Sequence, residues 1–175
     1  MNKLLAPERR KEIQQRANEI LEKYHDIEKT AFLLQKIAED NGIEILESDL
    51  FDISGALRFE NGKWRIYVNK DDSNARKIFT IAHELGHYFM HSESEKEFVD
   101  GQFVMNRAEA DRFSQRELEA NEFAGNLVMP EQEIRKRLDG QKPTQEKVLE
   151  LAKKFNVSAL AMATRLRNLD IYVPE

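Results

Sequence analysis

The first part of the chain carries apolar residues at helical spacing. From residue 7 to residue 24 they recur at every third or fourth position, and the pattern returns from residue 27 to residue 40. Proline is favoured in the first turn of a helix, as at Pro7, and Asn-Gly commonly ends one, as at Asn41-Gly42. The pattern therefore predicts two amphipathic N-terminal helices.

The hydrophobic period changes at Ile43, after which apolar and polar residues alternate over short stretches up to residue 69. Two strands are expected to flank the segment 60–63, because its Asn-Gly pair is a strong signal for a two-residue hairpin turn. In the second of these strands Trp64 and Ile66 should face the same side of the sheet. If that strand lies at the sheet edge, an extended peptide can add to it as a further strand; a covered edge is the alternative.

Helical spacing returns over residues 73–91, where the sequence IFTIAHELGHYFMH fills positions 78–91. The segment 92–113 is polar and is expected to be irregular. A further helix is predicted over residues 114–128, with Pro130 closing the run.

Short helices are predicted after Pro130. The stretch LAKKFNVSALAMATRL (151–166) resembles a helix-turn-helix in which Ser158 caps the second helix. Residues 131–167 carry nine basic and five acidic side chains. This excess is small, and such helix pairs serve packing or partner recognition more often than DNA readout. Nucleic-acid binding through residues 144–168 is therefore the less favoured interpretation.

Composition narrows the class of protein. The chain has 175 residues, of which 41% are hydrophobic and 34% charged, as expected for one globular domain with room for a small appendage. It has no cysteine, which excludes disulfides, thiolate metal sites and a cysteine nucleophile. A net charge of −5 argues against a protein that mainly coats nucleic acid. The start of the chain lacks the apolar core of a signal peptide, and no run is long enough to span a bilayer, so we expect a cytoplasmic protein without a membrane partner.

Candidate chemistry is concentrated in the HELGH sequence at 83–87. Residues four positions apart lie on the same face of a helix, so His83 and His87 are able to hold one metal ion between them. Glu84 lies beside them and has the chemistry of a general base acting on a metal-activated water. Gly86 weakens the helix by about 1 kcal/mol relative to alanine, which indicates that another backbone passes close to this position.

A third ligand is expected from the helix at 114–128. On a helix, four of its residues share one face: Glu117, Ala120, Asn121 and Ala124. One acid, one amide and two small residues suit a metal site, with Glu117 as ligand, the alanines allowing close approach, and Asn121 steadying a ligand by a hydrogen bond. Glu119 points elsewhere on the helix and is the alternative acidic ligand.

The other two histidines are weaker candidates. His91 shares the face of His87, but an ion held by His83 and His87 would lie roughly a helical turn away from it. A supporting or surface role is the more consistent interpretation of His91. His25 falls between the two N-terminal helices, far from the motif in sequence, and is interpreted as a surface or capping residue.

Taken together, FTIAHELGHYFMH (79–91) and ELEANEFAGNLVMP (117–130) resemble the ImmA/IrrE family of metallopeptidases, whose second motif is E-x-x-A-N-x-F-A followed by a Leu/Met-Pro ending. The resemblance covers roughly residues 27–170. It implies a gluzincin-like site in which His83, His87 and Glu117 bind Zn²⁺ and Glu84 is the catalytic base. The family includes proteases that cleave helix-turn-helix repressors of mobile elements or of stress responses, so such a repressor is the expected partner.

These observations predict an α+β fold with two parts. Residues 1–130 are expected to form a zincin-like metallopeptidase domain, with N-terminal helices at 7–40, a small twisted sheet at 43–69 packed on the HExxH helix, and active-site helices at 73–91 and 114–128. Residues 131–175 are expected to form a helical, helix-turn-helix-like subdomain.

Two functions remain open from the sequence. The favoured one is a zinc-dependent endopeptidase, with Arg65, Tyr67 and Tyr88 as candidates by residue type for stabilising the oxyanion. The alternative is a non-catalytic regulator that binds a repressor or DNA through its C-terminal helices and keeps the metal for structure. A structural site needs a fourth protein ligand, and the sequence offers no convincing one.

Overall fold

Two helices, α1 (Pro7–Lys23) and α2 (Thr30–Asp40), precede the sheet. The computed structural model describes residues 5–26, 29–99 and 107–171. Helix α1 begins with a proline in its first turn and buries Ile13, Ala17 and Ile20, which are spaced at helical intervals. Helix α2 ends at Asn41-Gly42, where the positive φ of +68° at Gly42 turns the chain towards the first strand. Both predicted N-terminal helices are therefore present.

The sheet has four strands in the order β1-β3-β2-β4. Its strands are β1 (Ile43–Ser48), β2 (Gly55–Glu60), β3 (Lys63–Asn69) and β4 (Glu97–Val99). Strand β1 is parallel to β3, and both other pairs are antiparallel.

The predicted hairpin joins β2 and β3. Glu60 pairs with Lys63, and Asn61 and Gly62 both have positive φ, at 52° and 78°, as a type I′ turn requires. Strand β3 lies between β1 and β2 rather than at an edge. Both edges of β3, the strand before the HELGH helix, are therefore covered by other strands. Strand β3 cannot take up an extended peptide. The order of strands depends on long-range pairing, which alternation along a single strand does not report.

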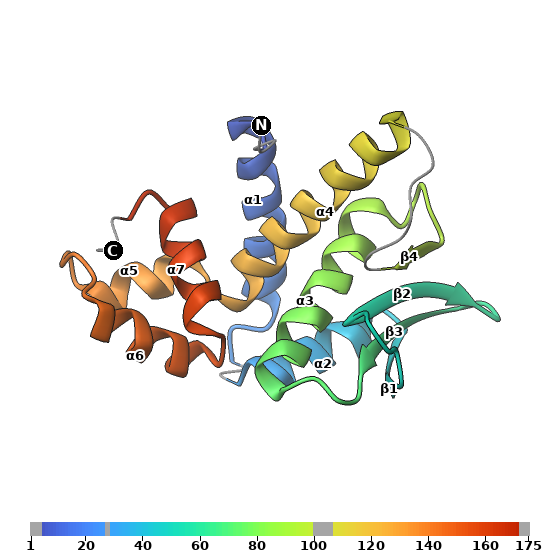
Figure 1. The fold of residues 1–175 in the computed structure, drawn as a ribbon, viewed down its shortest axis with the longest axis horizontal. Coiled ribbons are helices and arrows are strands. Elements are labelled where there is room, and N and C mark those ends of the chain that lie inside the picture. Colours follow the sequence, from blue (N-terminus) through green and yellow to red (C-terminus); the bar gives the residue numbers. More distant parts are fainter. Residues whose placement is uncertain (1–4, 27–28, 100–106, 172–175) are drawn as a thin grey trace.

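Helix α3 (Asn74–His91) carries the HELGH sequence and packs against the sheet (Figure 1). Ser73 caps its N-terminus, with the side-chain oxygen accepting a hydrogen bond from the backbone N–H of Arg76. Apolar side chains from the inner face of β3, including Trp64 and Ile66, join the same hydrophobic core as Ala82 and Leu85 of α3. The sheet thus provides the rigid support under the motif helix.

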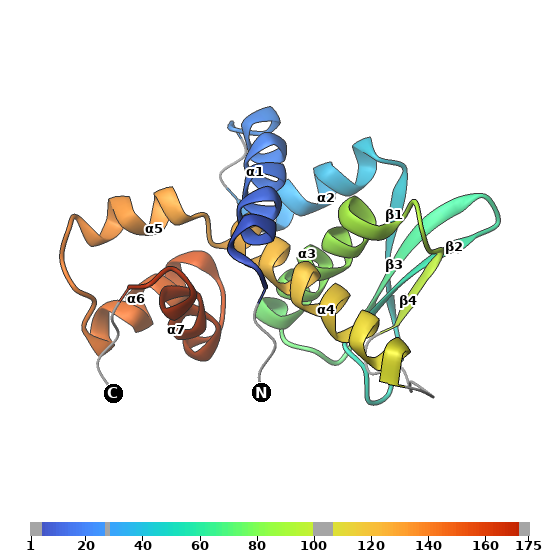
Figure 2. The same ribbon diagram turned by 90° about the horizontal axis from the view of Figure 1, so that it is seen from above.

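Helix α4 (Arg107–Val128) crosses α3, and α1 packs against α4 (Figures 1 and 2). The prediction placed the start of this helix at 114 and made all of 92–113 irregular, and both were wrong. Strand β4 lies within that segment, and the helix already begins at Arg107. Its first turns are rich in helix-forming Arg, Ala and Glu but lack an apolar stripe, so hydrophobic periodicity did not report them.

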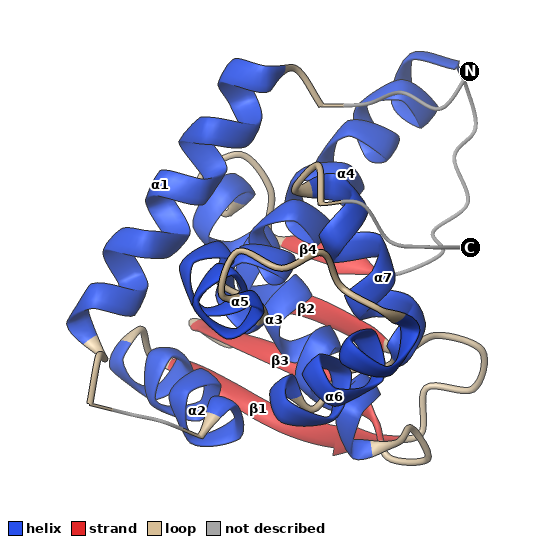
Figure 3. Ribbon diagram, turned by 90° about the vertical axis from the view of Figure 1, so that its left-hand side faces the viewer, coloured by secondary structure: helices blue, strands red, loops and turns tan. Residues whose placement is uncertain are grey.

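The C-terminal part folds as α5 (Glu131–Leu138), α6 (Gln145–Phe155) and α7 (Ala159–Asn168). These helices lie on the opposite side of α1 and α4 from the sheet (Figures 2 and 3). Arg165 of α7 connects them to α4: its side chain is 3% exposed and donates to the carbonyl of Met129 and to the side-chain oxygen of Asn126.

Seven helices and a four-stranded sheet in the part of the chain that the structure describes make a mixed α+β fold, as predicted. No helix within the ranges 5–26, 29–99 and 107–171 combines the length and apolar character needed to cross a membrane. The boundary near residue 130 stays a prediction.

Candidate metal centre

Helix α3 presents His83 and His87 one turn apart on the side that faces α4. Their Nε2 atoms are 3.1 Å apart, and both imidazoles are buried. The ring of His87 also stacks on Phe98 of β4, with ring centroids 4.7 Å apart. Two imidazole nitrogens at this separation can contact the same ion.

Helix α4 brings Glu117 to these two nitrogens. One carboxylate oxygen lies 3.2 Å from Nε2 of His83 and the other 3.1 Å from Nε2 of His87. The donor atoms of His83, His87 and Glu117 lie within 4.8 Å of one another. The structure therefore brings together the two motif histidines and the acid that the sequence placed on the facing helix.

The close approach of α3 and α4 depends on Gly86. A Cβ atom at this position would lie 2.9 Å from the carbonyl oxygen of Ala120 and 3.0 Å from its Cα. The prediction that another backbone passes close to Gly86 is confirmed, and that backbone belongs to the helix that carries Glu117. Ala120 itself is fully buried, so a larger side chain there would also separate the helices.

Asn121 contacts the side chain of the candidate ligand His83. Its Oδ1 lies 3.0 Å from Nδ1 of His83, and an amide oxygen can only accept a hydrogen bond. Nδ1 of His83 must therefore carry a proton, so Nε2, which faces Glu117 and His87, is the nitrogen that can bind an ion. This is the tautomer that a metal ligand requires.

The charge at the site is set by Glu117. Burial alone raises the pKa of this carboxyl group, but hydrogen bonds and charges from His83 and His87 outweigh burial and lower its pKa to about 2. Glu117 is therefore ionised throughout the physiological pH range, so no proton has to be displaced from it when a cation binds.

Glu84 lies on α3 between the two histidines in sequence and is 0% exposed. It packs against Gly55 of β2, where a Cβ atom would come within 2.9 Å of its carboxylate oxygen and would also collide with Thr80. Gly55 is thus needed for the position of Glu84, and sequence reasoning missed it. Because an alternating strand pattern reports side chains that pack, a strand glycine whose role is to leave space gives no such signal.

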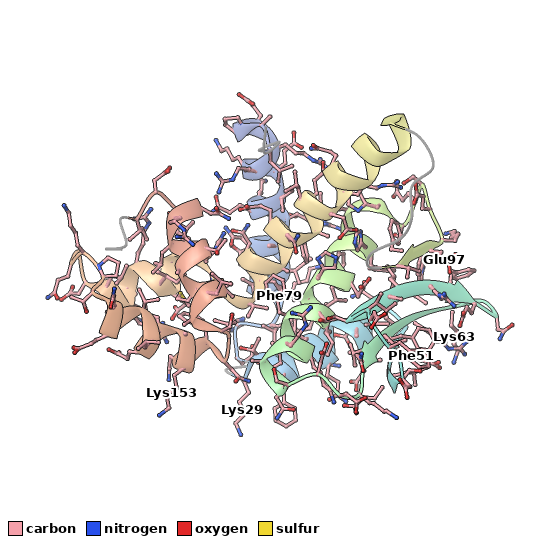
Figure 4. The ribbon with its side chains drawn as sticks, in the orientation of Figure 1. Lys29, Phe51, Lys63, Phe79, Glu97 and Lys153 are labelled. Carbon is pink, nitrogen blue, oxygen red and sulfur yellow. The ribbon has the colours of Figure 1, made fainter. Side chains whose placement is uncertain are left out.

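A pocket of about 520 Å³ opens beside the three donor residues, and His83 and Glu117 line it. One wall comes from the first turns of α3, including Phe79, and the opposite wall includes Ser158 and Ala161 at the start of α7. Figure 4 shows Phe79 on α3, in the middle of the molecule between the sheet and the C-terminal helices. The candidate centre is therefore accessible from solvent on one side.

Several candidates from the sequence lie elsewhere. Glu119 contacts His91 rather than the donor cluster, and His25 is an exposed residue after α1 whose Nδ1 lies 3.1 Å from the Glu22 carbonyl oxygen. Of the oxyanion candidates, Arg65 and Tyr67 project from the outer face of β3 and pair with glutamates of the sheet.

The third oxyanion candidate, Tyr88, makes an edge contact with Trp64, and none of the three lines the pocket. All three were chosen by residue type alone, which carries no information about the face on which a side chain lies.

Two imidazole nitrogens and one carboxylate form a donor set that suits divalent transition metals. In the part of the chain that the structure describes, these three residues form a candidate metal-binding cluster, and no fourth histidine or acidic side chain joins them. The cluster fits an ion that is held by three protein ligands and is open on one side.

Comparisons with known proteins agree with this geometry. The model of a peptidase family, described as the IrrE N-terminal-like domain, matches residues 38–167. No curated protein sequence matches the chain. Among solved structures, a Mycobacterium tuberculosis transcriptional regulator has a similar fold, with a TM-score of 0.65 and 18% sequence identity over 89% of this chain and 46% of that protein.

At this identity the likeness to the regulator shows a shared fold, and the chain spans less than half of the regulator's length. The family model, in contrast, covers most of the chain, including the HELGH helix and the Glu117 helix. The protein therefore belongs to the IrrE N-terminal-like peptidase family.

Proposed function

We propose that the protein is a zinc-dependent endopeptidase. The observation that carries this proposal is a cluster of two histidines and one glutamate, of which His83 and Glu117 line an open pocket, with no fourth histidine or acidic side chain joining it among the residues that the structure describes. Structural zinc sites are closed by four protein ligands, whereas catalytic sites keep one position for water or substrate. The donor set is that of His₂Glu zinc peptidases.

Zinc held by His83, His87 and Glu117 would act as a Lewis acid, polarising a peptide carbonyl and lowering the pKa of a bound water to about 7. His83 and His87 provide neutral nitrogen donors, and Glu117 provides the negative charge. Asn121 holds His83 in the required tautomer. Glu84, fixed against β2 beside Gly55, takes a proton from the attacking water and passes it to the leaving amine.

The pocket supports a protein substrate. It extends from His83 and Glu117 to the first turn of α7, so a polypeptide bound across the candidate centre would also contact Ser158 and Ala161. In DNA-binding helix-turn-helix proteins, the N-terminal residues of the second helix contact base edges. Here two residues at the corresponding place, Ser158 and Ala161, line the pocket, which favours recognition of the substrate over DNA readout.

The substrate class follows from the family resemblance. We propose a helix-turn-helix transcriptional repressor, whose cleavage would derepress a mobile element or a stress response. The similar fold of a transcriptional regulator is consistent with a role in gene control but does not distinguish cleavage from binding.

The test compares wild-type protein with Glu84→Gln on a co-expressed helix-turn-helix repressor, and measures bound zinc and cleavage products by mass spectrometry. Glu84→Gln should retain zinc, because its metal-binding side chains are unchanged, and should cleave at least about 100-fold more slowly, because it lacks the proton acceptor.

Glu93→Gln makes the same chemical change on an exposed residue just beyond α3 and should behave as wild type. If the repressor is lost equally with wild type and Glu84→Gln, hydrolysis is not the activity, and the interpretation as a binding regulator with a structural metal is favoured.

A further inference from the structure

The last turn of α3 places a third histidine directly behind the candidate metal ligand His87. Nδ1 of His91 lies 3.3 Å from Nδ1 of His87, and Nε2 of His91 lies 3.1 Å from a carboxylate oxygen of Glu119. His91 is 8% exposed and Glu119 is 7% exposed, so water does not substitute freely for either contact. Neither residue belongs to the donor cluster.

The directions of these hydrogen bonds follow from the role of His87. When Nε2 of His87 is a metal donor, its Nδ1 carries the proton, so Nδ1 of His91 must accept that hydrogen bond. The proton of His91 is then on Nε2, where it is donated to the carboxylate of Glu119. Each donor between His87 and Glu119 therefore meets an acceptor.

This series of hydrogen bonds continues into helix α1. A guanidinium nitrogen of Arg9 lies 2.6 Å from the same Glu119 oxygen that His91 contacts, and Gln115 donates to the other oxygen. Helix α1 spans Pro7–Lys23 and precedes residues 38–167, which match the family model. A segment outside the family-matched region thus reaches the candidate centre through two intervening side chains.

We infer that α1 completes the metal centre: Arg9 fixes Glu119, Glu119 fixes His91, and His91 holds the imidazole of His87 in the orientation that binds the ion. His91, Glu119 and Arg9 are positioning residues in this arrangement. The carboxylate of Glu119 orients His91 and strengthens it as an acceptor, which in turn raises the basicity of His87. This inference rests on the proposed zinc centre but does not depend on peptide hydrolysis.

Two adjacent arginines of α1 provide a matched test. Arg9 and Arg10 each form an ion pair with a glutamate of α4, Arg9 with Glu119 and Arg10 with Glu122 at 3.6 Å, and both arginines are about a third exposed. Arg9→Met and Arg10→Met therefore each remove one ion pair between the same two helices. Arg9→Met also removes a contact with Glu12, and Arg10→Met a hydrogen bond to the Asn168 carbonyl. Only the Arg9 contact leads to a metal ligand.

The readout is the zinc dissociation constant of the full-length protein, measured by competition with a chromophoric chelator, with urea unfolding of the zinc-free protein as a check on folding. Removing a group that orients a metal ligand typically weakens metal affinity about 10- to 100-fold. We expect such a loss for His91→Phe, which keeps an aromatic ring next to Phe98. For Arg9→Met we expect a loss of about tenfold. Arg10→Met should leave the dissociation constant unchanged.

A conservative variant separates the hydrogen bond from packing. In His91→Asn the side-chain oxygen takes the place of Nδ1 and can accept from His87, so it should recover part of the affinity that His91→Phe loses. Unchanged zinc affinity in folded His91→Phe and Arg9→Met would overturn the inference, as would equal losses in Arg9→Met and Arg10→Met. Absence of zinc binding by the wild type would overturn the zinc centre and this inference together, whereas zinc binding without Glu84-dependent cleavage would overturn hydrolysis alone.

Discussion

Glycine at position 86 sets the distance between the two helices that carry the candidate metal ligands. Its missing Cβ leaves room for the backbone of Ala120, and Glu117 lies less than one turn from Ala120 on the same helix. Gly55 has the corresponding role beside Glu84. At the scale of single residues, the site is thus determined as much by absent side chains as by the polar groups that provide the chemistry.

Gly86→Ala should lower the free energy of unfolding by about 1–3 kcal/mol, because the added methyl group overlaps the backbone of Ala120 and forces α3 and α4 apart. Zinc affinity should fall as well, because Glu117 moves with α4. Urea unfolding and chelator competition measure the two effects.

Gly125→Ala is the control, since it is also a helical glycine but a Cβ there would meet only Arg165 at an ordinary distance of 3.7 Å. It should leave stability unchanged or raise it by up to about 1 kcal/mol through helix propensity. Equal effects at positions 86 and 125 would show that close helix packing is not the reason for Gly86.

At the scale of elements, helix α7 is held in place by a buried cation. The Arg165 guanidinium donates to the Met129 carbonyl at 3.1 Å and to the Asn126 side chain at 2.8 Å, and it lies 3.4 Å from Glu122. All three partners are on α4 or directly after it. This attachment fixes the first turn of α7 as a wall of the pocket.

Arg165→Met should reduce the free energy of unfolding by about 3 kcal/mol, because the buried acceptors that Arg165 satisfies lose their donor. Arg167→Met makes the same change two residues later on an exposed position and should stay within about 0.5 kcal/mol of wild type. Urea unfolding of both variants tests this. Similar values for both would mean that apolar packing, rather than Arg165, holds α7 against α4.

At the scale of the whole molecule, the candidate centre joins segments that are far apart in the chain. Helix α3 packs on the sheet, α4 crosses α3, and α1 contacts α4 on another side (Figure 1). Binding of an ion to His83, His87 and Glu117 would therefore tie α3 and α4 together. Because a ligand that binds only the folded state stabilises it, metal binding and global stability should be linked.

Zinc at about 100 times its dissociation constant should stabilise the protein by about 2.7 kcal/mol, which raises the melting temperature by about 5–10 °C for a chain of this length. Calorimetry with and without zinc measures the shift. Glu84→Gln should show the same shift as wild type, because it keeps all three proposed ligands. Glu117→Ala should show little shift; a full shift in this variant would exclude Glu117 as a ligand.

Local patterns in the sequence were enough for much of this architecture. The shared face of His83 and His87, the turn at Asn61-Gly62 and the face of α4 that carries Glu117 all follow from periodicity within one element. Helix and strand geometry alone relates residues a few positions apart, so one segment of sequence suffices to predict such features. The α+β fold class could be predicted for the same reason, whereas the family was predicted from the resemblance of residues 79–91 and 117–130 to its motifs.

Only the tertiary structure decided the rest. It placed β3 inside the sheet, directed the first turn of α7 towards the pocket, and connected Arg9 to His87 through Glu119 and His91. Each of these features depends on the packing of segments that are distant in sequence. Periodicity identifies the face of an element that will be buried, but it does not identify the partner against which that face packs.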